Sequence, residues 1–160
     1  MLFPGIQGGP LENIIAAKAV AFEEASKPVF KTYSLQIVRN AKALADELAK
    51  EGFRLVSGGT DNHLLNIDFG EDGMTGKDAE SLLEEANIVL NREVVPRDTR
   101  KPYISSGIRL GSPTVTTRGM KENEMRKTAK IVSAVLNKTI ETSEARVQVK
   151  ELVDAFPFSD

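Results

Sequence analysis

Residues 100–119 read RKPYISSGIRLGSPTVTTRG, and this stretch decides how we interpret the rest of the chain. Ile108, Arg109 and Leu110 predict a short strand, in which the arginine points to one face and the two apolar side chains to the other. Serines and glycines border this strand, so β propensity does not account for an arginine within it. A guanidinium in such a place is suited to holding an anion with two parallel hydrogen bonds. The anion is either a bound ligand or a neighbouring carboxylate, and the residues alone leave both possibilities open.

The composition is that of an ordinary globular domain. The chain has 160 residues, of which 41% are hydrophobic and 28% charged, and its formal net charge is −2. Because no basic face stands out, we expect neither nucleic-acid nor membrane-surface binding. No apolar run reaches the about 20 residues that span a bilayer, and the first ten residues do not resemble a signal peptide. The absence of cysteine excludes disulfides and thiolate metal sites, and we expect a cytoplasmic protein.

Outward from the central stretch, the spacing of apolar residues predicts helices and strands in mixed order. Helices are expected over residues 11–27, 31–50, 122–136 and 143–155, with a further helix capped by Thr75 and Asp78. Strands are expected over residues 53–56, 63–69 and 88–90. We therefore predict an α+β domain at residues 31–160, in which helices cover one face of a small, mostly antiparallel sheet. Residues 1–30 are expected to form a loop and a connecting helix, which is apolar on most sides.

A few polar residues remain as candidates for a functional site. Gly8 and Gly9 precede a predicted helix and could offer N–H groups to a phosphate, although a flexible loop is the more common meaning of such a pair. His63 is the only histidine, so it cannot form a metal site with a second one, and a structural hydrogen bond is expected. No catalytic nucleophile is visible. Arg109 and Arg118 are the best candidates, as anion-binding residues or as members of structural ion pairs.

Five segments, taken in order, resemble the C-terminal part of the serine hydroxymethyltransferase family. They are FPGIQGGPLENIIAAKAVAF at residues 3–22, NAKALADEL at 40–48, GFRLVSGGTDNHLLNID at 52–68, TGKDAE at 75–80 and SSGIRLGSPTVTTRGMKENEM at 105–125. The resemblance covers almost the whole chain. It implies the aspartate-aminotransferase-like fold of pyridoxal-phosphate enzymes, and the interconversion of serine and glycine with transfer of a one-carbon unit to or from tetrahydrofolate.

The resemblance also implies roles for single residues around the cofactor and the amino acid. Gly8 and Gly9 correspond to a loop that approaches the cofactor phosphate across the dimer interface. Arg109, in the segment SGIRLG, corresponds to the arginine that binds the carboxylate of serine or glycine. Arg118, in TTRG, corresponds to an arginine that we assign to anchoring the cofactor site.

The folate side of the site shows departures from the family pattern. Lys101, Pro102 and Tyr103 stand where the family contacts folate, usually with the sequence Ser-Pro-Phe. Glu93 replaces a common asparagine near the folate, and Asn13 replaces a common histidine. We expect these differences to affect the pterin contacts and to leave the carboxylate-binding arginine untouched.

The resemblance finally implies that the chain works as part of a larger enzyme. The lysine that forms the Schiff base in this family, and the large domain around it, lie upstream of the matching segments. We therefore expect a C-terminal portion of a homodimeric or homotetrameric enzyme, without a catalytic residue or a metal site of its own and inactive alone. The alternative is a non-catalytic module that binds an amino acid or pairs with a full-length subunit.

Overall fold

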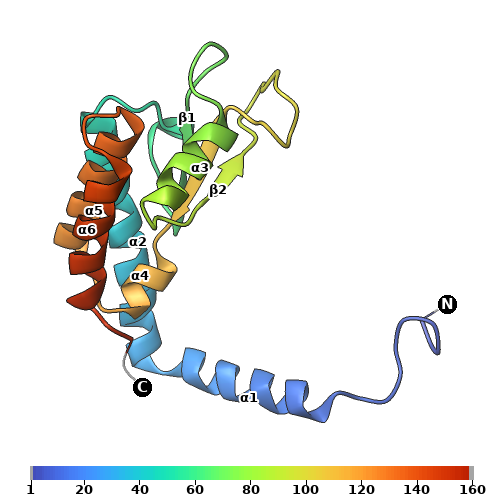
Figure 1. The fold of residues 1–160 in the computed structure, drawn as a ribbon. Helices are drawn as coiled ribbons and strands as arrows, with labels where there is room; N and C mark the ends of the chain where they lie inside the picture. The colour runs from blue at the N-terminus through green and yellow to red at the C-terminus, as the bar shows by residue number, and fades with distance from the viewer. Residues whose placement is uncertain (1, 159–160) are drawn as a thin grey trace. The chain divides into compact units, whose positions relative to one another are not determined.

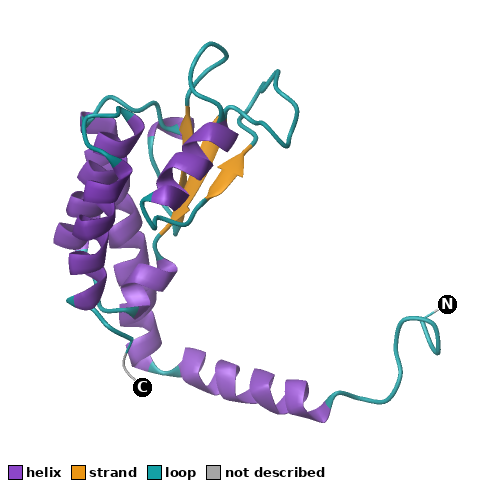
Figure 2. Cartoon of the chain, in the orientation of Figure 1, coloured by secondary structure: helices purple, strands orange, loops and turns teal. Residues whose placement is uncertain are grey.

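The computed structural model describes residues 2–158, as helices and one small sheet (Figures 1 and 2). The chain divides into two compact units, one that extends to Ser34 and one that begins at Leu35. This division falls inside a helix, α2 (Pro28–Lys50). Among the described residues, no helix combines the length and the apolar character of a membrane span.

The first unit contains α1 (Glu12–Ser26) and the first residues of α2. The break between the two helices lies where Pro28 disfavours a helical Lys27, whose backbone is extended with ψ at 146°. No side chain that the structure describes in α1 is buried. The exposed apolar residues in and next to α1 are Leu11, Ile14, Ile15, Val20 and Phe22.

The second unit is the α+β domain that the sequence predicts. After α2 it contains η1 (Val56–Gly58), β1 (Leu64–Asp68), α3 (Gly76–Glu85), β2 (Asn91–Glu93), β3 (Gly107–Gly111), α4 (Pro113–Thr117), α5 (Glu122–Leu136) and α6 (Thr142–Asp154). The strand β3 is central and runs antiparallel to both β1 and β2. Figure 1 shows α3 over the sheet, where it packs against β2 and β3. The predicted fold class is thus confirmed.

The hydrophobic core lies on one face of the sheet. Its strand residues are Leu65, Ile67, Ile108 and Leu110, all of which are buried. They pack in one cluster with apolar residues of the helices, which include Leu48 of α2, Leu83 of α3 and Val132 of α5. Because side chains alternate along a strand, the residue between Ile108 and Leu110 must point to the opposite face.

A glycine fixes how closely the strands approach at one end of β3. A Cβ atom on Gly107 would lie 2.5 Å from the carbonyl oxygen of Ile67 and 2.5 Å from Cγ1 of Val95. Both distances are far inside van der Waals contact, so no other residue fits without movement of the backbone. Gly107 therefore belongs to the packing of the sheet.

The predicted cap of α3 is confirmed. The hydroxyl of Thr75 accepts a hydrogen bond from the backbone N–H of Asp78 at 3.0 Å and donates to the carboxylate of Asp78 at 2.7 Å. At the end of α2, Gly52 has φ at +92°, and its N–H donates to the carbonyl of Ala49 at 3.1 Å.

Two local predictions are wrong, and one helix was missed. In place of a strand at residues 53–56, Leu55 makes one bridge with Ile67, because the chain then turns through η1 with φ at 61° at Ser57. The strand predicted at 88–90 lies at β2, three residues later, where the chain pairs with β3. The helix α4 was not predicted, since its sequence PTVTT is rich in β-branched residues.

Candidate functional site

Arg109 lies in the centre of β3, on the face of the sheet opposite the core. Its neighbours in register are Asn66 on β1 and Asn91 on β2. The guanidinium atom Nη1 is 3.2 Å from Oε2 of Glu93, and the side chains of Arg109 and Glu93 are 42% and 30% exposed. With its amide oriented to satisfy both polar atoms, Asn91 accepts a hydrogen bond from Nη2 of Arg109 at 2.9 Å. Two side chains of β2 therefore hold the two ends of the guanidinium fork.

This ion pair corrects one expectation from the sequence. Glu93 was expected to affect only the folate contacts, but it contacts the arginine assigned to the substrate carboxylate. Glu93 and Asn91 are two residues apart on β2, so both side chains point to the same face as Arg109. A glutamate and an arginine are residue types that form ion pairs, so the sequence allowed this contact. The two side chains meet because β2 lies at residues 91–93 and not at the predicted residues 88–90.

Arg109 also lines an open pocket of about 420 Å³. Its wall includes His63, which precedes β1, and Pro113 and Thr114 of α4. His63 is exposed, and no group of residues within 2–158 is arranged to hold a metal ion. The pocket thus combines a cationic fork with uncharged walls, an arrangement suited to a small anion.

The wall formed by α4 is held in place by a buried hydrogen-bond network. The side-chain N–H groups of Asn40, on α2, donate to the hydroxyl of Thr116 at 2.8 Å and to the carbonyl of Met120 at 2.9 Å. Ser112, which precedes α4, donates to the carbonyl of Ile37 at 2.8 Å. Asn40, Ser112 and Thr116 are buried. This network was missed in the sequence, where Asn40 stands between Arg39 and Ala41 and carries no local signal of burial.

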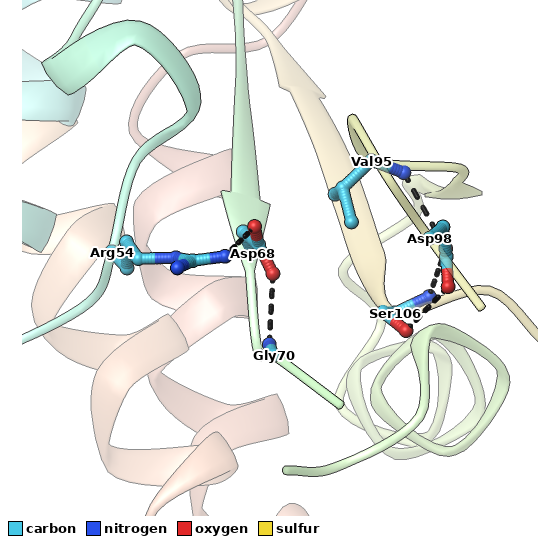
Figure 3. Close-up of polar contacts among 6 residues, drawn as sticks. All are labelled: Arg54, Asp68, Gly70, Val95, Asp98 and Ser106. Atoms are coloured by element: carbon cyan, nitrogen blue, oxygen red, sulfur yellow. Dashed lines mark hydrogen bonds and ion pairs between the residues drawn. The ribbon is translucent and has the colours of Figure 1, made fainter. Parts of the chain in front are cut away.

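The proposed folate residues belong to a loop that follows β2, and Asp98 organises it. The carboxylate of Asp98 accepts hydrogen bonds from the N–H and the hydroxyl of Ser106 at 2.8 and 2.7 Å (Figure 3). It also accepts a hydrogen bond from the N–H of Arg100 at 3.0 Å. Burial alone would raise the pKa of Asp98, but these hydrogen bonds favour the charged form and lower its pKa below the usual 3.8. The loop is therefore closed around an ionised carboxylate.

A second carboxylate fastens the end of β1 beside this loop. Asp68 forms an ion pair with Arg54 and accepts a hydrogen bond from the N–H of Gly70 at 2.8 Å (Figure 3). On the far side of the loop, the guanidinium of Arg100 donates to the carbonyl of Met74 at 3.1 Å and to that of Gly73 at 2.8 Å. Arg54 thus ties the end of β1 to the segment before η1, and Arg100 ties the loop to the connection between β1 and α3.

Lys101, Pro102 and Tyr103 lie at the exposed tip of this loop. The ammonium of Lys101 is 5.9 Å from the ring centroid of Tyr103, and the tyrosine is 60% exposed. An exposed aromatic ring next to a cation can stack on a flat ligand. These residues lie in the connection between β2 and β3, whereas Arg109 lies in β3 itself.

Arg118, which caps the end of α4, contacts the C-terminal helix. Its Nη2 donates to the carbonyl of Val153 at 3.1 Å, and its guanidinium carbon lies 4.3 Å from the ring centroid of Phe158. Its Nε is buried without a hydrogen-bond partner among the described residues. These contacts connect α4 to α6 and fit an anchoring function.

Gly8 and Gly9 lie in the first unit and line an open pocket of about 650 Å³, together with Lys18 of α1. A Cβ atom added to either glycine would meet nothing within 4 Å. Neither packing nor crowding inside this unit explains why these residues are glycines. Bare backbone N–H groups and a nearby ammonium fit a phosphate that approaches from outside.

The fold and the site together define an α+β domain that presents an arginine to a ligand pocket. A sequence model described as serine hydroxymethyltransferase matches residues 1–132. The chain is also similar to a serine hydroxymethyltransferase of Lactobacillus gasseri, with 54% identity over 157 residues, which cover 96% of this chain and 38% of that protein. The chain therefore belongs to the serine hydroxymethyltransferase family, and it spans little more than a third of the length of this relative.

Proposed function

We propose that this chain is the C-terminal part of a serine hydroxymethyltransferase and that Arg109 binds the carboxylate of serine or glycine. The observation that carries the proposal is the position of Arg109, on the solvent side of the sheet and in the wall of a pocket. The enzyme would interconvert serine and glycine and exchange a one-carbon unit with tetrahydrofolate. A planar guanidinium fits a carboxylate with two hydrogen bonds, so it fixes the orientation of the amino acid as well as its position.

The cofactor that the family implies is pyridoxal phosphate, which when bound serves as an electron sink for bond breaking at the α-carbon of the amino acid. In this chain, Gly8 and Gly9 would approach its phosphate across a subunit interface. The fit rests on the open space around both glycines and on the neighbouring Lys18. Arg118 would support the cofactor site indirectly, because it holds α4 against α6.

Tetrahydrofolate would contact the tip of the loop at Lys101, Pro102 and Tyr103. The exposed ring of Tyr103 offers a face for stacking, and Lys101 offers a positive charge to a carboxylate of the folate tail. The loop can serve as a fixed edge of the site because Asp98 closes it from inside.

We further propose that residues 1–30 connect residues 31–160, the small domain, to the large domain of the enzyme, and that the enzyme is a homodimer or homotetramer in the cytoplasm. The exposed apolar side chains of α1 support this arrangement, since such a helix needs a partner surface. The same observation supports the alternative, a non-catalytic module that pairs with a full-length subunit.

Replacement of Arg109 by alanine tests the main proposal. In the complete enzyme, we expect Arg109→Ala to lower kcat/KM for serine by roughly 10²–10³-fold, because a two-pronged, charge-assisted contact is lost. Steady-state kinetics with serine and tetrahydrofolate measure this effect. Arg109→Lys keeps the charge without the fork and should recover only part of the loss. An unchanged kcat/KM in Arg109→Ala would refute the role of Arg109.

A further inference from the structure

The ion pair between Arg109 and Glu93 occupies the place where a ligand carboxylate would bind. Glu93 Oε2 lies 3.2 Å from Nη1 of Arg109, and Asn91 accepts from Nη2 on the other side of the fork. A carboxylate that binds with two hydrogen bonds needs two nitrogen atoms of the same guanidinium. The ligand and Glu93 therefore compete for one positive charge.

Glu93 differs from the other side chains that surround Arg109 on this face of the sheet. The two residues in register with Arg109 are amides, Asn66 and Asn91, which can orient a guanidinium without neutralising it. The Oδ1 atom of Asn66 is buried and has no hydrogen-bond partner among the described residues, so an uncharged acceptor stands unused on the β1 side. Among the residues that the structure describes, Glu93 is the carboxylate that pairs with Arg109.

We propose that Glu93 is an internal competitor for the carboxylate site and weakens the binding of the amino acid. The inference rests on the proposed function of Arg109. In the free protein Glu93 neutralises the guanidinium, and an incoming carboxylate either displaces Glu93 or binds beside it against like-charge repulsion. Glu93 thereby sets the substrate affinity through Arg109, as a positioning residue.

The partial exposure of the pair decides how strong this competition is. Ion pairs that are open to solvent stabilise a protein by only a fraction of a kcal/mol up to about 1 kcal/mol, so a ligand can displace Glu93. The corresponding change in ligand affinity is about two- to fivefold. Glu93 therefore lowers the affinity of the site for a carboxylate but does not prevent binding.

The same strand offers a matched control. Arg92 Nη1 lies 3.3 Å from Oε2 of Glu80, and these side chains are 39% and 25% exposed, close to the values of the Arg109–Glu93 pair. Glu80 belongs to α3, and Arg92 is in register with Ile108 rather than with Arg109. Glu80→Gln removes an equivalent ion pair without touching the proposed site.

The test is a titration of the full chain with glycine, followed by NMR through the side-chain Nε–H signal of Arg109. In Glu93→Gln we expect this signal to shift before any glycine is added, and the Kd for glycine to fall by about two- to fivefold relative to the parent chain. Glu80→Gln should keep the parent Kd. Glycinamide, which has no carboxylate, should leave the Arg109 signal unmoved in every variant.

The outcomes separate this inference from the proposed function. Glycine binding to Arg109→Ala is followed through its backbone amide signals, because this variant has no Nε–H at position 109. If Arg109→Ala abolishes glycine binding while Glu93→Gln keeps the parent Kd, Glu93 is no competitor and the role of Arg109 stands. If Arg109→Ala binds glycine as the parent does, the proposed function fails and the inference with it. An Arg109 signal that glycine does not shift in Glu93→Gln also overturns the inference. Backbone amide spectra report whether each variant is folded, and Glu93→Ala serves as a second variant.

Discussion

Single buried polar residues fix one wall of the pocket that Arg109 lines. Asn40 joins α2 to the turn at α4, and it does so with no exposed surface of its own. Its two donors are fully used inside the protein, where water cannot replace a lost partner. A residue outside the pocket thus fixes one wall of it.

We expect Asn40→Ala to lower the free energy of unfolding by about 2–3 kcal/mol, because the carbonyl of Met120 and the hydroxyl of Thr116 lose a buried donor. Chemical denaturation of the full chain measures this difference. Gln36→Ala is the control: it removes a donor to Asn40 at the partly buried end of the network and a hydrogen bond to Glu122, and it should cost less than about 1 kcal/mol. Equal costs for the two variants would contradict the network.

At the scale of elements, the loop between β2 and β3 is held by a charge as well as by the buried side chain of Val95. Asp98 receives its hydrogen bonds from residues on both sides of the loop, so its ionised form joins the start of the loop to the start of β3. Any condition that protonates this carboxylate should loosen the loop tip at residues 101–103.

The pH dependence of stability follows from the direction of this pKa shift. Since the pKa of Asp98 is lowered in the fold, its contribution to stability is complete above the usual value of 3.8 and is lost as the pH falls through the lower, folded value. We expect Asp98→Asn to reduce stability at neutral pH by about 1–2 kcal/mol and to lessen the decline in acid. Denaturation at neutral and acidic pH checks this. Asp72→Asn, at an exposed carboxylate, should leave both the stability and its acid decline near those of the parent.

Elements with a strong local signal could be predicted from the sequence. The helix at residues 122–136 and the cap at Thr75 depend on spacing and on neighbouring residues, so their positions are confirmed. The strand β2 has three residues, and its position is fixed by pairing with β3, which is distant in sequence. The contact of Glu93 with Arg109 depends on that pairing and was therefore missed.

At the scale of the whole molecule, the two units differ in how they bury apolar surface. The second unit encloses a core that draws on the sheet and on helices α2, α3, α5 and α6, while α1 keeps apolar side chains exposed. A helix of this composition in water favours association with another apolar surface.

We expect the full chain to self-associate through α1. Ile15 is 57% exposed and Phe22 is 72% exposed, so replacing both by glutamate should not disturb a core. Each side chain is worth about 1.5–3 kcal/mol when it is buried, so the double variant should raise the dissociation constant at least about tenfold. Sedimentation velocity measures the association. Equal sedimentation of the parent and the variant would exclude α1 as the contact.

The crowded position of Gly107 has a consequence for the alignment of the sheet. Next to Gly107, the carbonyl of Ile67 and the side chain of Val95 leave space for a hydrogen atom but not for a Cβ atom. If β3 slipped by one residue against its neighbours, a residue with a side chain would have to occupy this space. The same slip would turn the guanidinium of Arg109 into the core and Ile108 out to solvent. The absence of a side chain at Gly107 therefore fixes the register of β3. This register keeps the guanidinium of Arg109 on the face of the sheet that a ligand can reach.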